Sequence, residues 1–284
     1  MKFKGATATL SDRIHLNFHI ASPKVFAIND ELNVKFTYTG RNGEVTEWVS
    51  ADPNKAENGN YVFSLTSLVA AYMATEITAE VGIGTADAFV VQDSMTYSIR
   101  EYGKAILDGN YQQKDKDAAA MLLNYGAWAQ SYFGYNEGNP ANTVVPNAQK
   151  VTDTGEWLAQ IESIDQYRAT VSGKLDSFMG YTLLLKDGTA MRIYFNEQVT
   201  ATVDGVAAPA VKDTDSERWY IEIAGVGAGN LDTAHTVVVN GTMTISNLSV
   251  LSPARTVAKS NAHSENFRNL CISLILYAQR VNQL

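Results

Sequence analysis

The chain has 284 residues, of which 45% are hydrophobic and 18% charged, so two ordinary folded domains are expected rather than disorder. Its formal net charge of -8 disfavours nucleic acid and anionic membrane surfaces as partners, because both are negatively charged. No apolar run is long enough to cross a bilayer, so no membrane insertion is expected in this segment. The single cysteine, Cys271, excludes an internal disulfide and lies in an apolar helical stretch, where a buried thiol is expected.

Alternating apolar and polar residues predict strands along the first half of the chain. In residues 14–20, Ile14, Leu16, Phe18 and Ile20 share one face. Further strands are predicted at residues 32–38, 45–49, 61–65, 76–81 and 89–97.

Helical spacing follows these strands. Ser98 and Glu101 form a capping box, which predicts a short helix over residues 99–107. A longer helix is expected from about Asp115 to Phe133, because apolar residues recur there every three and four positions. In this helix Gly126 and Ala129 would let a partner element approach closely.

The second half repeats the order of strands, short helix and long helix. Strands are predicted at residues 181–186, 191–195, 200–203, 219–223, 236–239 and 242–250. Ser252 is expected to cap a short helix that has Pro253 in its first turn and ends near Lys259. A long helix is predicted from Glu265 to about Gln283.

These two halves can be aligned, which indicates an internal repeat. The alignment pairs residues 32–36 with 191–195, 61–65 with 219–223, 78–81 with 236–239, and Asn124–Tyr125 with Leu276–Tyr277. The predicted fold is mainly β with α: two β-sandwich-like units, each followed by a short helix and a long helix. The first unit would span residues 1–137, a linker residues 138–156, and a second, divergent copy residues 157–284.

Residues 96–102 (TYSIREY) and 120–133 (AMLLNYGAWAQSYF) resemble a duplicated module of large secreted and cell-surface proteins of gut and rumen Clostridia. The resemblance covers nearly the whole chain, and the chain departs from it at the C-terminus. It implies an extracellular or cell-surface location, as a segment of a larger Firmicutes-like protein. The family has no settled biochemical role. The aromatic residues of the second motif are expected to serve packing, because they recur at helical spacing.

No catalytic, cofactor-binding or metal-binding arrangement is expected from the sequence. His15 and His19 share a strand face, but their Cα atoms would lie about 13 Å apart, too far to share one metal ion. The glycine-rich segment 225–229 has no Lys-Ser or Lys-Thr behind it, so a loop is favoured over a phosphate site. The chain is therefore expected not to be an enzyme. A carboxylate pair for glycan cleavage stays open, because its spacing depends on the fold.

One acidic segment, residues 213–217, offers oxygen ligands at a spacing that calcium accepts. It lacks the glycine and the closing glutamate of an EF-hand loop. A solvated hairpin loop is favoured, and calcium binding stays open.

Trp48 is the one candidate for ligand contact, since β-sandwich binding modules place exposed aromatic rings against sugars. Core or helix packing is nevertheless favoured for each aromatic residue, Trp48 and Trp219 included. The leading expectation is a non-catalytic extracellular or cell-surface module for adhesion, spacing or partner display, with a glycan or a surface protein as partner. The alternatives are a carbohydrate-binding module attached to a larger secreted protein and a cryptic glycan-active enzyme.

Overall fold

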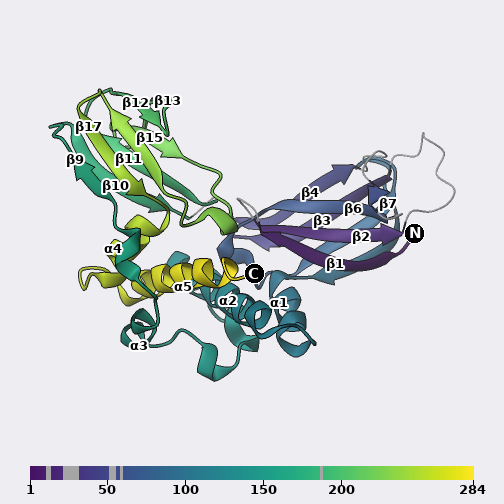
Figure 1. Ribbon diagram of the computed structural model, residues 1–284. Coiled ribbons are helices and arrows are strands. Elements are labelled where there is room, and N and C mark those ends of the chain that lie inside the picture. Colours follow the sequence, from purple (N-terminus) through teal and green to yellow (C-terminus); the bar gives the residue numbers. More distant parts are fainter. Residues whose placement is uncertain (11–13, 22–31, 51–55, 58–59, 186–187) are drawn as a thin grey trace. The chain divides into compact units, whose positions relative to one another are not determined.

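A computed structural model of the chain describes all residues except 11–13, 22–31, 51–55, 58–59 and 186–187 (Figure 1). The described chain is mainly β with α, as the sequence predicts. It divides into two compact units: unit 1 comprises residues 1–10 and 14–146, and unit 2 begins at Asn147 and runs to Leu284. None of the helices in these ranges has the length and apolar character needed to cross a membrane.

The described residues of unit 1 form two antiparallel sheets of four strands each. The first has the order β1-β2-β6-β5, with β1 (Phe3–Leu10), β2 (Ile14–Ala21), β6 (Asn60–Leu68) and β5 (Ala56–Glu57). The second has the order β4-β3-β7-β8, with β4 (Gly43–Ser50), β3 (Leu32–Gly40), β7 (Ile77–Ile83) and β8 (Val90–Tyr97).

The core of unit 1 lies between these two sheets. The alternate residues Leu16, Phe18 and Ile20 of β2 are fully buried, as are Val34 and Phe36 of β3. The ring centroids of Phe18 and Phe36, one from each sheet, lie 5.3 Å apart. The period-2 pattern thus gives each sheet one apolar face, and the two faces pack against each other.

Two helices complete unit 1, at the predicted places: α1 (Ile99–Asp108) and α2 (Gln113–Phe133). The predicted capping box is present, since the Glu101 amide donates to Ser98 Oγ at 3.1 Å and the Ser98 amide donates to the Glu101 carboxylate at 3.1 Å. Gly126 brings α2 close to Met73, because a Cβ added to this glycine would lie only 2.5 Å from the Met73 sulfur.

Two antiparallel sheets are also formed by the part of unit 2 that the structure describes. The first has the order β10-β11-β15-β14, with β10 (Phe178–Leu184), β11 (Ala190–Phe195), β15 (Trp219–Ile223) and β14 (Val211–Lys212). The second has the order β13-β12-β16-β17-β9, with β13 (Val206–Pro209), β12 (Thr200–Val203), β16 (His235–Val239), β17 (Met243–Leu248) and β9 (Thr170–Ser172).

The described residues of unit 2 form three α-helices: α3 (Thr154–Ala159), α4 (Leu251–Lys259) and α5 (Glu265–Val281). The sequence did not predict α3, whose Thr154 hydroxyl donates to Asn269 Oδ1 of α5 at 2.8 Å. The predicted cap of α4 is wrong, because the helix begins at Leu251 and Ser252 already lies inside its first turn. The Ser252 hydroxyl instead accepts the Ser249 amide at 3.0 Å, which ties the helix to the residues before it.

The strand orders show which segments of the two units correspond, and they correct one part of the predicted alignment. β11 takes the place of β2, so residues 191–195 correspond to residues 16–20 and not to 32–36. Both edge strands carry the same bulge, at Phe3/Gly5 in β1 and at Phe178/Gly180 in β10, and both glycines have positive φ. The predicted alignment was wrong because the spacing between these strands differs. β3 begins eleven residues after β2 ends, whereas β12 begins five residues after β11 ends, so a single offset cannot align both pairs of strands.

Candidate functional site

The outer face of the sheet β4-β3-β7-β8 in unit 1 carries the sequence-predicted candidate. Trp48 lies on β4 with 38% of its surface exposed. It pairs across the sheet with Lys35 of β3, which in turn pairs with Glu80 of β7. Because directly paired residues point to the same side of a sheet, these three side chains form one row on the face turned away from the core.

The Trp48 indole is supported by Phe89, which precedes β8. The two ring centroids lie 4.9 Å apart and the rings meet at 88°, an edge-to-face contact of the kind that contributes about 0.5–1.5 kcal/mol beyond burial. Gly82 makes room for this arrangement, since a Cβ there would approach the Phe89 ring to 2.7 Å. Trp48 is therefore held in a defined orientation while part of its surface stays open to solvent.

Lys35 and Glu80 form an ion pair beside the indole, with Nζ 2.9 Å from the carboxylate oxygen. Their side chains are 32% and 28% exposed. A pair this exposed contributes about 1 kcal/mol or less to stability, because water screens it. It does, however, keep the centre of the face close to electrically neutral.

A row of four threonines crosses the sheet next to the Trp48 row. Thr46, Thr37, Thr78 and Thr96 are paired in register through β4, β3, β7 and β8. The Thr78 and Thr96 hydroxyl oxygens lie 3.2 Å apart. Each hydroxyl is one donor and two acceptors, and neighbouring strands lie about 4.8 Å apart. The row thus offers several hydroxyl groups, one per strand, to a polyhydroxylated ligand.

Beyond the threonine row the face deepens into a polar cleft of about 740 Å³. Two acidic residues line it, Glu44 of β4 and Glu76 just before β7, together with Thr39, Asn136 and Asn139. Glu44 lies four residues from Trp48 on the same strand, which corresponds to about 13 Å along the sheet. The indole and the cleft are therefore two ends of one surface.

The wall of the cleft is the segment that follows α2, and hydrogen bonds fix it in place. The Tyr135 hydroxyl donates to the Thr39 carbonyl at 2.6 Å. The Gln130 side chain donates to the carbonyls of Asn136 and Asn139 at 3.3 and 3.2 Å and accepts the Ala141 amide at 2.7 Å. Part of the segment expected to be a linker, residues 138–156, is thus bound to unit 1. The remainder, from Asn147, belongs to unit 2.

Other residues singled out in the sequence have local structural partners. His19 Nε2 lies 2.9 Å from the Thr7 hydroxyl on the neighbouring strand. In the acidic segment, the Asp213 carboxylate accepts from the Ser216 hydroxyl at 2.8 Å and the Asp215 amide at 3.1 Å, which lowers the pKa of Asp213. Within the described ranges, no three His, Cys, Asp or Glu side chains gather as a metal site would require.

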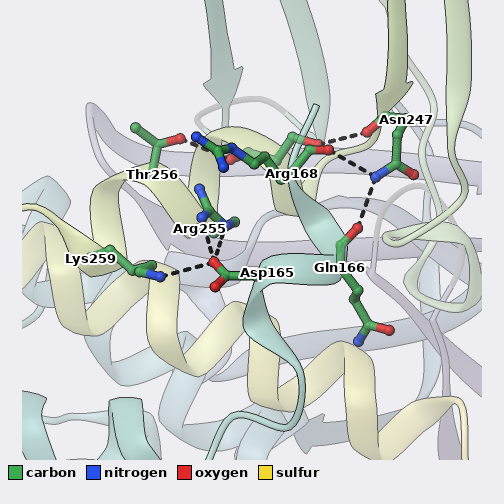
Figure 2. Close-up of polar contacts among 8 residues, drawn as sticks. Asp165, Gln166, Arg168, Asn247, Arg255, Thr256 and Lys259 are labelled. Atoms are coloured by element: carbon green, nitrogen blue, oxygen red, sulfur yellow. Dashed lines mark hydrogen bonds and ion pairs between the residues drawn. The ribbon is translucent and has the colours of Figure 1, made fainter. Parts of the chain in front are cut away.

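Unit 2 contains an ion-pair cluster that fastens the turn at Ile164–Tyr167 to α4 (Figure 2). Asp165 Oδ1 accepts from Lys259 Nζ at 2.9 Å and from Arg255 Nε at 3.1 Å. The hydrogen bond from Lys259, with that from Arg255, lowers the pKa of Asp165 to about 2. Asn247 Nδ2 donates to the carbonyls of Gln166 and Arg168 at 2.8 and 2.9 Å. Every polar group of this cluster named here binds another part of unit 2, so its role is structural.

An apolar pocket of about 350 Å³ also lies in unit 2, between β10, α4 and α5. Cys271 and Phe267 of α5, Val257 of α4 and His263 are among its lining residues. Burial raises the pKa of the Cys271 thiol, so the group stays protonated and unreactive at neutral pH.

Sequence reasoning proposed Trp48 but missed the rest of the surface around it. Phe89, the threonine row and the cleft depend on strand register, which pairs residues far apart in the chain. The alternate positions of Lys35 and Thr37 on the strand predicted at residues 32–38 were the available signal.

No protein-family model matches this sequence. No curated protein is similar enough to it to count as a relative.

Proposed function

We propose that the chain is a non-catalytic glycan-binding module that holds a sugar chain along the outer face of the sheet β4-β3-β7-β8. The observation that carries this proposal is the exposed Trp48 ring, fixed by Phe89 and followed along the same face by hydroxyl, amide and carboxylate groups. A flat apolar ring beside ordered polar groups is complementary to a sugar, which has an apolar ring face and polar hydroxyls at its edge.

The chemistry of each part of the face suits one part of a sugar. The C–H side of a pyranose ring is apolar, and stacking it on an indole removes both surfaces from water. The hydroxyls at the ring edge need donors and acceptors once they are desolvated, and the threonine row supplies both. An oligosaccharide lying along the strands would meet the indole first and the cleft about 13 Å further on.

We further propose that the chain acts outside the cell, as a segment of a larger secreted or surface protein, in adhesion or in displaying a partner. The resemblance of residues 96–102 and 120–133 to a module of such proteins supports this location. Sugar polymers of cell walls are the ligands that such a protein would meet. Recovery of the parent protein only in the cytosolic fraction of its natural host would contradict this part of the proposal.

A glycan array with the purified full chain tests binding, and a pair of variants locates it. Trp48→Ala removes the exposed ring and is expected to weaken binding at least about tenfold, the cost of losing a central aromatic contact. Tyr132→Ala is the matched control, because Tyr132 is 40% exposed and also meets a phenylalanine edge-to-face, but lies on α2. Equal loss in both variants, or no glycan bound at high protein concentration, would refute the proposal.

One observation favours a second candidate, a glycan-cleaving enzyme: Glu44 and Glu76 line the same cleft. Two carboxylates across a sugar are what acid–base cleavage of a glycosidic bond requires. Incubation of the bound oligosaccharide followed by chromatography separates the candidates. The binding proposal predicts no products. Products that disappear in a Glu44→Gln/Glu76→Gln double variant would establish the enzyme instead.

A further inference from the structure

We infer that the cleft beside the threonine row selects the charge of the glycan: it accepts an uncharged sugar and rejects one that carries a carboxylate. This inference rests on the proposed glycan-binding function and names the class of ligand that the same face takes. The residues that would make the selection are Glu44 and Glu76, which we assign as specificity-determining residues.

The cleft is preformed, so a sugar entering it meets fixed groups. Its floor is the outer face of β3 and β7, where Thr39 and Thr78 lie. Its wall is held by the Tyr135 hydroxyl on the Thr39 carbonyl, at 2.6 Å, and by the Gln130 side chain on two wall carbonyls. Gln130 is itself 1% exposed, so this clamp is shielded from water. A site that is already ordered loses little entropy on binding.

The amide groups of the wall suit neutral hydroxyls. Asn139 Oδ1 accepts a hydrogen bond from Arg100, which leaves the Asn139 NH₂ group as a donor for a ligand oxygen. Asn136, also on the wall, has a left-handed backbone at φ 50° and a solvent-exposed side chain. Donors of this kind bind sugar hydroxyls without requiring charge on the sugar.

The side chains around the cleft carry a net negative charge. Glu44 and Glu76 both line it. The Arg41 guanidinium is engaged elsewhere, over the Phe133 ring at 5.3 Å and on the Phe133 carbonyl at 3.3 Å. Arg100 is bound to Asn139, so it supplies one positive charge behind the wall against the two carboxylates. Lys35, the cation of the neighbouring row, is paired with Glu80.

A uronic acid placed in the cleft would therefore bring a third carboxylate close to two others. Two like charges about 5 Å apart in a water-like medium weaken binding about fourfold. The uronate would meet two such charges, and the nearby Arg100 would offset part of their repulsion. The affinity of the uronate should therefore be lower by roughly tenfold or less. Because both glutamates are exposed, salt would screen this penalty and reduce it. A neutral sugar pays no such cost and keeps the hydrogen bonds of the threonines and amides.

Calorimetric titration of the full chain with two probes, xylohexaose and hexagalacturonate, tests the inference at low and high salt. Wild type is expected to bind the neutral probe and to bind the uronate about five- to tenfold more weakly at low salt. Glu44→Gln/Glu76→Gln is expected to bring the two affinities to within about twofold. Glu197→Gln, a substitution of an exposed glutamate in unit 2, is the matched control and is expected to leave the ratio unchanged.

Equal affinity of wild type for both probes would overturn the charge selection, and so would a ratio that the double variant does not change. In both cases binding of the neutral probe would leave the proposed function standing. Failure to bind either probe, or any glycan of the array, would overturn the proposed function and the inference together. The single variants Glu44→Gln and Glu76→Gln, each expected to move the ratio part of the way, guard against misfolding of the double variant.

Discussion

In unit 1 one row across the outer sheet face is Trp48, Lys35 and Glu80, and in unit 2 a row on the equivalent sheet is Ala207, Thr202 and Val238. The strand orders β4-β3-β7-β8 and β13-β12-β16-β17 make these two sheets equivalent, strand by strand. Unit 2 thus keeps the framework and replaces the aromatic and charged groups by small or apolar ones. The inward-facing residues therefore suffice to determine the strand order. The outward-facing residues can differ between the units, so one unit alone can carry a ligand site.

Aromatic residues do occur on a face of unit 2, but on its other sheet and in a closed arrangement. Arg192 stacks over the Tyr220 ring at 4.0 Å and pairs with Glu222 at 2.6 Å, while the Tyr194 ring lies 6.0 Å from Tyr220. The cation already occupies the ring face that a sugar would need. Unit 2 therefore serves as the natural internal control for unit 1.

Both units use a glutamine near the end of their long helix to bind a neighbouring backbone segment. Gln130 of α2 binds the segment after its helix, and Gln279 of α5 binds Glu162, accepting its amide at 3.3 Å and donating to its carbonyl at 2.8 Å. Both glutamines follow an alanine, Ala129 and Ala278. Pairing Gln130 with Gln279 gives an offset of 279 - 130 = 149, which is three residues from the offset of 277 - 125 = 152 predicted from Tyr125 and Tyr277.

The largest expected effect comes from the core of unit 1. Phe18→Ala removes a fully buried ring that packs on Phe36, so the free energy of unfolding should fall by about 3–5 kcal/mol. Differential scanning calorimetry is expected to show the transition of unit 1 moving to lower temperature and that of unit 2 staying in place. An equal downward shift of both transitions would contradict the description of two compact units.

Alkaline pH should affect unit 1 through Tyr38. Burial, with the nearby Glu47, raises the pKa of Tyr38 to about 12 from an ordinary value of 10. The folded state holds this proton more tightly, so the stabilisation is complete below pH 10 and is lost as pH rises toward 12. The loss should reach about 2 kcal/mol. Denaturant titrations between pH 9 and pH 12 should show less loss in Tyr38→Phe than in wild type. Identical curves would refute this cause.

A smaller effect is expected where α2 meets Met73. Gly126→Ala places a Cβ 2.5 Å from the Met73 sulfur, so the neighbouring side chain must move. Such overpacking costs about 1–3 kcal/mol, of which about 1 kcal/mol is offset by the better helix propensity of alanine. Gly138→Ala is the control, because no atom lies within 4 Å of its added Cβ. Thermal melts should separate the two variants, and a more stable Gly126→Ala would contradict the close packing.

The smallest effect should come from Asp165 in unit 2. Its pKa is lowered to about 2, chiefly by the hydrogen bond from Lys259. The associated stabilisation is present above the ordinary value near 4 and is lost as pH falls toward 2. Acid melts of wild type and Asp165→Asn are therefore expected to differ slightly at neutral pH and to converge near pH 2. A difference that persists below pH 2 would rule out the ion pairs as its source.

The sequence predicts the long, regular elements of this fold well, because hydrophobic spacing alone identifies them. β2, β3, α1, α2 and α5 lie where their patterns place them. The elements that escaped prediction are short or weakly patterned: β1 consists largely of glycine, alanine and threonine, and β14 has two residues. Their positions are set by neighbouring strands, which a local pattern does not contain.

The candidate site was less predictable for a related reason. An aromatic residue on a strand can be recognised in the sequence, which is why Trp48 was singled out. The row through Lys35 and Glu80 joins residues 45 positions apart, and the wall of the cleft comes from the helix end near Tyr135. Such a surface exists only after the sheet has paired and the helix has docked.

The most direct test of the central claim is a two-dimensional NMR titration that follows the indole N–H signals of the full chain, with the Trp48 signal assigned through Trp48→Phe. The chain has four tryptophans, two of which, Trp157 and Trp219, lie in unit 2 and report on binding there. Addition of a neutral oligosaccharide that binds is predicted to shift the Trp48 signal and to leave those of Trp157 and Trp219 unchanged. A bound oligosaccharide that shifts the Trp219 signal while the Trp48 signal stays fixed would contradict the account.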